Sequence, residues 1–142
     1  MITVGEISVD LNDPLTQLAL AGALVRAADV PGIFTFTTWE DARRIARYIE
    51  DYRVESALVV GGGLIGLKTI EALLGREIKV TVVELADRIL GTIFDVTGSR
   101  IAEAILRREG VDLRTGTTAE EVVVRGGRVD HAVLHNGERV DC

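Results

Sequence analysis

The chain has 142 residues, a formal net charge of −6 and a single cysteine, Cys142. This length suits one domain, which buries about 68% of the surface that its unfolded chain exposes. The negative charge leaves no basic field for DNA or RNA, and one cysteine excludes an internal disulfide and a multi-cysteine metal site, so we expect no nucleic-acid partner and no metal.

The sequence carries no targeting or membrane-spanning signal of the usual kinds. No run of about 18 apolar residues occurs, and the N-terminus lacks a basic stretch followed by an apolar core. Together with the low cysteine content, this predicts a soluble, cytoplasmic protein without a membrane partner.

The first third of the chain has a mixed pattern. Residues 1–11 alternate apolar and polar side chains, which predicts a half-buried strand, whereas residues 16–29 suit a helix or a buried strand equally well. A β-branched and aromatic run at 32–38 indicates another strand, and Thr38 can cap a helix at 39–52. The apolar positions of that helix fall on one face, where we expect core packing: Trp39, Ala42, Ile45, Ala46 and Ile49.

The middle of the chain alternates strands and helices. Its continuous apolar run "SALVV" is typical of a central parallel strand with both faces covered. The expected elements are strands at 56–60, 78–84 and 111–115 and helices at about 65–74 and 95–109, the last with Ile101, Ala104 and Ile105 inward. This order predicts an α/β fold, a Rossmann-like βαβαβ unit whose parallel sheet has helices on both faces.

The last quarter predicts a three-stranded antiparallel meander. Its β-rich runs are separated by Gly126-Gly127 and Asn136-Gly137, which supply the positive φ of tight hairpin turns. His131 and His135 have strand-like spacing and no companion nucleophile or metal cluster. We therefore interpret them as ordinary strand residues and expect no catalytic residue in the chain.

Two phosphate-binding loops compete for the segment "GGGLIGLKT". A P-loop needs a glycine directly before the lysine, but Leu67 stands there, which would disrupt the phosphate cradle. The Rossmann pattern fits directly, since Gly61 permits the turn out of the strand, Gly63 lets a diphosphate approach the backbone, and Gly66 lets the helix pack closely. Gly62 keeps the turn free of a side chain, and the helix N-terminus then faces the diphosphate.

A carboxylate strengthens this interpretation. Glu84 stands at the end of the next predicted strand, at the spacing expected of an acid that holds an adenosine ribose. Such an acid favours NAD over NADP, because it would repel the 2′-phosphate of NADP. Arg88 lies nearby in the sequence, and its positive charge acts against this preference. The alternative interpretation is that Glu84 is a solvated strand end.

The segments "VVGGGLIGLKTIEALL", "KVTVVELADRIL" and "FDVTGSRIAEAILRREGVDLRTGTTAEEV" together resemble a known family. They are similar to the NAD(H)-binding domain of FAD-dependent pyridine nucleotide-disulfide oxidoreductases, of the NADH oxidase, rubredoxin reductase and nitrite reductase type. The resemblance covers residues 31–142 and implies that the domain presents NADH to a flavin. It implies a cofactor site in which Glu84 holds the adenosine ribose, and Leu85 and Gly116 lie near the adenine. The residues implied to line the pyrophosphate are Gly61, Gly63, Leu64, Ile65 and Gly66.

Parts of the family pattern are missing from this sequence. It has no N-terminal FAD fingerprint and no redox-active cysteine pair, and Lys68 stands where the family usually has a glutamate near the nicotinamide. We therefore expect a piece of a larger flavoprotein, in which residues 1–30 flank the NAD(H) domain as a remnant of the FAD domain and could mediate self-association. FAD itself is not expected on this chain, and turnover is expected to be small or absent. The alternative is a stand-alone Rossmann-type nucleotide-binding or regulatory module, and a stand-alone dehydrogenase is a weaker third hypothesis.

Overall fold

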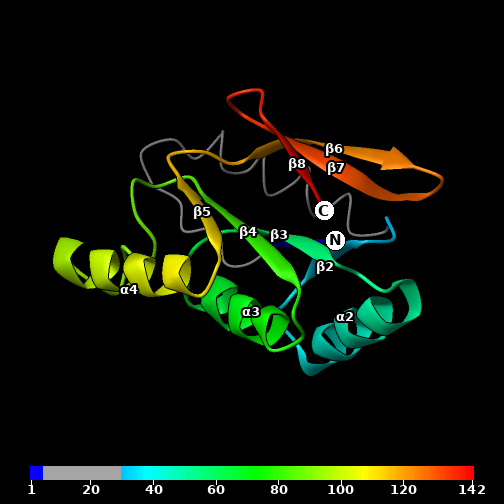
Figure 1. The fold of residues 1–142 in the computed structure, drawn as a ribbon, viewed down its shortest axis with the longest axis horizontal. Helices are drawn as coiled ribbons and strands as arrows, with labels where there is room; N and C mark the ends of the chain where they lie inside the picture. Colours follow the sequence, from blue (N-terminus) through cyan, green and yellow to red (C-terminus); the bar gives the residue numbers. More distant parts are fainter. Residues whose placement is uncertain (5–29) are drawn as a thin grey trace.

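The computed structural model describes residues 1–4 and 30–142 of the chain, which form two β-sheets and three α-helices (Figure 1). The larger sheet has five parallel strands in the order β2-β1-β3-β4-β5. Their bounds are β1 Ile2–Val4, β2 Ile33–Thr35, β3 Ser56–Val60, β4 Lys79–Glu84 and β5 Asp112–Thr115. Strand β3 lies at the centre, as its continuous apolar sequence predicts, with Leu58 and Val59 wholly buried.

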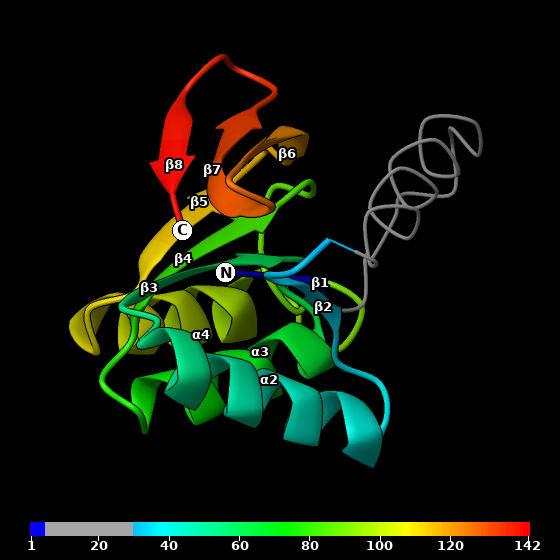
Figure 2. The same ribbon diagram turned by 90° about the vertical axis from the view of Figure 1, so that its right-hand side faces the viewer.

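The helices α2 (Trp39–Tyr52), α3 (Leu64–Leu74) and α4 (Val96–Arg108) lie together on one face of this sheet, and an antiparallel sheet covers the other face (Figure 2). The strands of that second sheet are β6 (Ala119–Arg125), β7 (Arg128–Leu134) and β8 (Arg139–Asp141), as the predicted meander requires. Alternate residues of β3 serve the two layers: Val59 packs toward the helices, whereas Leu58 and Val60 pack toward the meander.

The predicted fold class is confirmed, with one difference in the layers. Helices were expected on both faces, but the described helices share one. The chain passes from β2 to β3, β4 and β5 in a single direction along the sheet, and right-handed crossovers that step in one direction leave their helices on the same side. The connection from β1 to β2 steps the other way and lies outside the described residues.

The N-terminal predictions are tested in part. Strand β1 confirms the start of the strand expected at 1–11, and its place between β2 and β3 puts Ile2–Val4 inside the parallel sheet. The ambiguous segment at 16–29 lies outside the described residues. The domain boundary at residue 31 stays a prediction, as does self-association through residues 1–30.

Helix α2 begins at a capping box, because the Thr38 hydroxyl accepts a hydrogen bond from the Asp41 N–H while the Asp41 carboxylate accepts one from the Thr38 N–H. Ile45 is buried as expected. Core packing of Trp39 was a wrong prediction, because this side chain is 77% exposed. Trp39 is the first helical residue, and side chains lean toward the helix N-terminus, so it points beyond the packed layer.

Helix α4 is rotated relative to the prediction. The three residues expected to face inward, Ile101, Ala104 and Ile105, are exposed, while Ser99 and Leu106 are buried. The Ser99 hydroxyl donates to the Ile89 carbonyl at 2.8 Å, and this hydrogen bond holds the side of α4 that carries Ser99 against the core. The apolar stripe at Ile101 and Ile105 therefore faces away from the core cluster.

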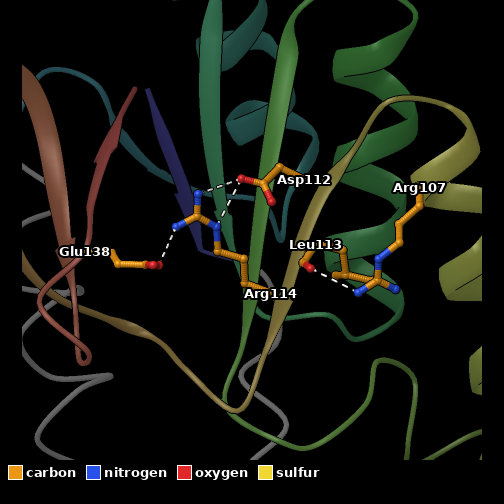
Figure 3. A network of polar contacts seen from close by, with 5 residues as sticks. All are labelled: Arg107, Asp112, Leu113, Arg114 and Glu138. Carbon is orange, nitrogen blue, oxygen red and sulfur yellow. Dashed lines mark hydrogen bonds and ion pairs between the residues drawn. The ribbon is translucent and has the colours of Figure 1, made fainter.

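An arginine network links the two sheets (Figure 3). Arg114 of β5 forms ion pairs with Asp112 on the same strand at 2.7 Å and with Glu138, in the turn between β7 and β8, at 2.9 Å. The hydrogen bond to Asp112 raises the pKa of the Arg114 guanidinium. Beside it, Arg107 of α4 donates to the Leu113 carbonyl at 3.1 Å, so helix, sheet edge and meander are joined at one corner.

Candidate functional site

The loop between β3 and α3 is held closely against its neighbours. Gly61 has φ of 102°, a left-handed conformation that favours glycine, and its N–H donates to the Val83 carbonyl at 2.8 Å. A Cβ atom on Gly66 would overlap the Gly61 carbonyl oxygen, so helix α3 can approach the end of β3 only with glycine at this position.

Gly62 is fixed by the segment that follows β4. A Cβ atom here would lie 2.6 Å from Cγ2 of Ile89, and the Gly62 carbonyl accepts a hydrogen bond from the Leu90 N–H at 2.9 Å. Packing against Ile89 therefore favours glycine at position 62. Nothing in the sequence pattern pointed to Ile89, because it follows the predicted strand without a motif of its own.

Glu84 is the centre of the site. Its side chain is buried, with 3% of the residue exposed, which rules out a solvated strand end. One carboxylate oxygen accepts a hydrogen bond from the Gly62 N–H at 2.6 Å, and the other accepts one from the Ala86 N–H at 2.8 Å. Each carboxylate oxygen can accept two hydrogen bonds, so Glu84 ties the glycine loop to β4 and keeps acceptor capacity for a hydroxyl.

The N-terminus of α3 has backbone donors without a side-chain cap. Its N-cap residue is Gly63, which has no side chain to accept a capping hydrogen bond. The first turn of α3 contains no acidic residue. The first N–H groups of a helix lack intrahelical acceptors and lie at the positive end of the helix dipole. This end of α3 can therefore receive an anion.

A hollow of about 330 Å³ adjoins the loop on the β4 side. Gly63, Glu84, Ala86, Arg88 and Gly91 contribute to its lining. Arg88 pairs with Asp87 at 3.0 Å through one terminal nitrogen, and its Nε is buried without a partner among the described residues. Because Arg88 brings a cation to the lining of this hollow, an anionic ligand would be favoured there.

The remaining predicted cofactor residues lie around these features. Leu64 and Leu85 are exposed and Ile65 is half-buried, directly beside Gly63 and Glu84. Gly116, with φ of 70°, donates from its N–H to the Ala86 carbonyl at 2.8 Å, so the loops after β4 and β5 meet. The structure thus brings the predicted set to one edge of the sheet, at the carboxyl ends of its strands.

The histidines are placed away from this edge. His131 is buried on β7, and its Nδ1 lies 2.7 Å from Asp130, whose pKa is lowered by that hydrogen bond. His135 is exposed. Within residues 1–4 and 30–142, no group of three or more histidine, cysteine or acidic side chains is arranged to hold a metal ion. In the same part of the chain, no helix is long and apolar enough to cross a membrane.

Comparison with known proteins gives consistent matches. The sequence pattern of the pyridine nucleotide-disulphide oxidoreductases matches residues 18–142. The rubredoxin-NAD(+) reductase of Pseudomonas putida is 32% identical over 117 residues, or 81% of this chain and 29% of that protein. The NADH oxidase of Methanocaldococcus jannaschii is 32% identical over 117 residues, or 82% of this chain and 26% of that protein.

A solved structure agrees with these sequence matches. The FAD-dependent pyridine nucleotide-disulphide oxidoreductase from Desulfovibrio vulgaris superimposes with a TM-score of 0.72 and 28% identity, covering 81% of this chain and 29% of that one. The parallel sheet, its crossover helices and its glycine loop define a Rossmann-type α/β domain. The chain belongs to the pyridine nucleotide-disulphide oxidoreductase family, and it spans less than a third of the length of these relatives.

Proposed function

We propose that this chain is the NAD(H)-binding domain of a larger flavin-dependent oxidoreductase. The observation that carries the proposal is the buried Glu84 carboxylate, which is bonded to the Gly62 N–H and lines the hollow beside the glycine loop. In this account the diphosphate lies on residues 61–66, Glu84 accepts hydrogen bonds from the adenosine ribose, and Leu85 and Gly116 lie near the adenine.

The residues present fit such a ligand. The uncapped N-terminus of α3 offers N–H donors for two phosphates. Gly66 lets this helix start in contact with Gly61, and the glycines place no side chain between the turn and a ligand. Glu84 has unused acceptor capacity for ribose hydroxyls. Arg88 adds a cation to the same hollow and would moderate a preference for NADH over NADPH.

The catalytic chemistry would belong to the larger protein. The relatives include an NADH oxidase, a rubredoxin-NAD(+) reductase and an FAD-dependent oxidoreductase, each more than three times the matched length. NADH would supply a hydride to a flavin held by an FAD domain, and the present chain would bind and orient the dinucleotide. The NADH ligand and the FAD domain are its proposed partners, and a cytoplasmic location stays a prediction.

A stand-alone nucleotide-binding module is the second candidate. The Arg88 cation in the lining of the hollow favours it, because a guanidinium could pair there with an additional phosphate, as in ATP. Lys68, the departure from the family pattern, is exposed and paired with Glu71 at 2.8 Å. That ion pair stabilises the surface of α3 and gives no reason to choose between the candidates.

Calorimetric titration of the chain with NADH, NADPH and ATP distinguishes the candidates. We expect saturable NADH binding that weakens at least about tenfold in Glu84→Gln, since a hydrogen-bond acceptor to the ligand and a tie to the loop are both changed. Glu138→Gln, which alters an exposed carboxylate that pairs with Arg114, is the control and should bind as the wild type does. Preference for ATP would contradict the oxidoreductase proposal.

A further inference from the structure

Helix α4 has an apolar side that the core does not use. The helix lies at the end of the helical layer, beside the edge strand β5 (Figure 1). On its inner side Ser99 and Leu106 are buried, and Ala102 packs against the core. On its outer side Ile101 is 59% exposed and Ile105 is 47% exposed. Since these two isoleucines contribute little to the fold, they are available for a contact with another molecule.

The outer side has the residue spacing of a coiled-coil seam. Five positions alternate by four and three residues, as the a and d positions of a heptad do: Phe94, Gly98, Ile101, Ile105 and Arg108. Phe94 precedes the helix but belongs to the seam, because a Cβ atom on Gly98 would lie 3.1 Å from its Cγ. The seam is therefore continuous from the start of α4 to its last turn.

Further apolar side chains widen this seam at its N-terminal end. Ile93 is 53% exposed and Val96 is 50% exposed, next to the partly exposed Phe94. Of the ten large apolar side chains that are exposed in the described residues, five lie between positions 93 and 105. Single exposed apolar side chains are ordinary on a protein surface, whereas a contiguous group of them marks an interaction surface.

The charges around the seam indicate that the partner is a second copy of this chain. Residues 93–109 contain three acidic residues and three arginines, so this segment is neutral although the whole chain has a net charge of −6. Two copies can therefore approach through this face without the repulsion that their net charges would cause elsewhere. A membrane surface would instead favour a helix with an excess of basic residues, which α4 does not have.

The two signs of charge are separated along the helix, and this sets the direction of pairing. Asp95 is the N-cap of α4, and Arg107 and Arg108 stand in its last turn. In an antiparallel pair, Arg108 of each copy would approach the partner's Asp95, and the two helix dipoles would be opposed. In a parallel pair the arginines of the last turns would lie together and repel each other.

We propose that α4 is a self-association surface, on which two copies of the chain pair as antiparallel helices about a twofold axis. Phe94, Ile101 and Ile105 of both copies form the apolar centre, and the same residues serve both sides of the interface. Interfaces that bury less than about 1,200 Å² are weak, so a seam of this length should give a dissociation constant on the order of 100 μM. The pairing needs no nucleotide, and its test is therefore separate from that of the dinucleotide site.

Sedimentation velocity at increasing protein concentration tests the pairing. The wild type should pass from monomer to dimer as its concentration rises to about 1 mM. Ile101→Glu should raise the dissociation constant at least about tenfold, because each dimer would then hold two carboxylates in an apolar seam. Trp39→Glu introduces the same side chain at another exposed apolar position, which makes it the matched control, and it should dimerise as the wild type does.

A charge reversal at the end of the seam tests the direction of pairing. In the antiparallel dimer, the carboxylate of Arg108→Glu would face the partner's Asp95, so the dissociation constant should rise about threefold or more. In a parallel dimer the same change would remove the repulsion between the last turns. Tighter association of Arg108→Glu would therefore contradict the antiparallel arrangement.

Other results would overturn the self-association surface. A wild-type chain that stays monomeric at about 1 mM does not pair through α4. Dimers that persist in Ile101→Glu form through another part of the chain, such as residues 1–30. A lower melting temperature of Ile101→Glu in a chain that never dimerises would mean that another segment of the same molecule covers the seam. In each of these cases the dinucleotide site would be unaffected.

Discussion

Helices α2 and α3 begin in opposite ways, although they lie side by side on the same face of the sheet (Figure 2). At α2, Thr38 and Asp41 cap the first turn with their own side chains. At α3, Gly63 leaves the first N–H groups without a side-chain partner, and the buried Glu84 carboxylate holds the preceding turn in place. One terminus is therefore closed by its own side chains, whereas the other keeps backbone donors that the proposed ligand would use.

The largest effect is expected from adding a side chain at the point where α3 contacts the end of β3. Gly66→Ala places a Cβ atom against the Gly61 carbonyl oxygen, which should lower the free energy of unfolding by about 2–3 kcal/mol and abolish NADH binding. Gly75→Ala, at the other end of α3, meets no atom closer than 3.5 Å and is the matched control. Denaturant unfolding and calorimetry measure both properties, and equal stability of the two variants would contradict the packing role.

A slightly smaller effect should follow from Glu84→Gln. The amide group of glutamine cannot accept from both the Gly62 and the Ala86 N–H, so one buried donor loses its partner, at a cost of about 2 kcal/mol. Thermal unfolding would detect the loss. An unchanged melting temperature would mean that the carboxylate does not hold the loop.

The contrast itself can be reversed by adding a cap to α3. The backbone of Gly63, with φ of −78° and ψ of −171°, is accessible to any residue, so Gly63→Asp can cap the helix as Asp95 caps α4. The added carboxylate would occupy the free N–H groups and repel a diphosphate, so NADH affinity should fall at least about tenfold while the chain stays folded. Undiminished NADH binding by a folded variant would place the ligand elsewhere.

Removing the cap of α2 should affect stability alone. Asp41→Asn should cost about 1 kcal/mol of unfolding free energy and leave NADH affinity unchanged. Burial acts to raise the pKa of Asp41, but hydrogen bonds from Thr37 and Thr38 outweigh it and hold the pKa below its usual value. The wild type therefore has this stabilisation above about pH 4 and loses it as the pH falls through the lowered pKa, whereas Asp41→Asn should not lose it. Unfolding measured between neutral and acidic pH tests the difference.

The smallest effect is expected from the ion pairs that join β5 to the turn between β7 and β8. Arg114→Ala removes the ion pairs with Asp112 and Glu138 at the corner shown in Figure 3, and partly exposed pairs contribute about 0.5 kcal/mol. Denaturant unfolding should register this small loss, and NADH affinity should not change. A change in NADH affinity would show that the meander influences the binding site and would contradict this prediction.

The sequence predicted the loop better than the helix faces around it. Gly61 and Gly66 were identified correctly because backbone conformation and close contact admit few residues other than glycine. The orientation of α4 was predicted wrongly because Ile101 and Ile105 form an apolar stripe that is typical of a buried helix face. The side that carries Ser99 is buried instead, where its hydroxyl bonds to the Ile89 carbonyl. Such a long-range bond has no periodic signal in the sequence.

Two side chains near the loop have surroundings that the sequence did not predict, for related reasons. The expected burial of Trp39 followed from its apolar character, but its place at the first position of α2 leaves it exposed. Arg88 was noticed as a neighbour of Glu84, yet its buried and partnerless Nε depends on how the chain after β4 folds back over the loop. Both cases concern side chains at element ends, where tertiary packing and not local pattern sets exposure.

An NMR titration of the backbone amides with NADH tests the proposed dinucleotide site directly. If the diphosphate lies on the glycine loop, the largest shifts should fall on the amides of residues 62–66, with smaller shifts at Leu85 and Gly116 and almost none in the meander. Saturable shifts confined to another surface, or no shifts at millimolar NADH, would contradict the claim that the open N-terminus of α3 is the dinucleotide site.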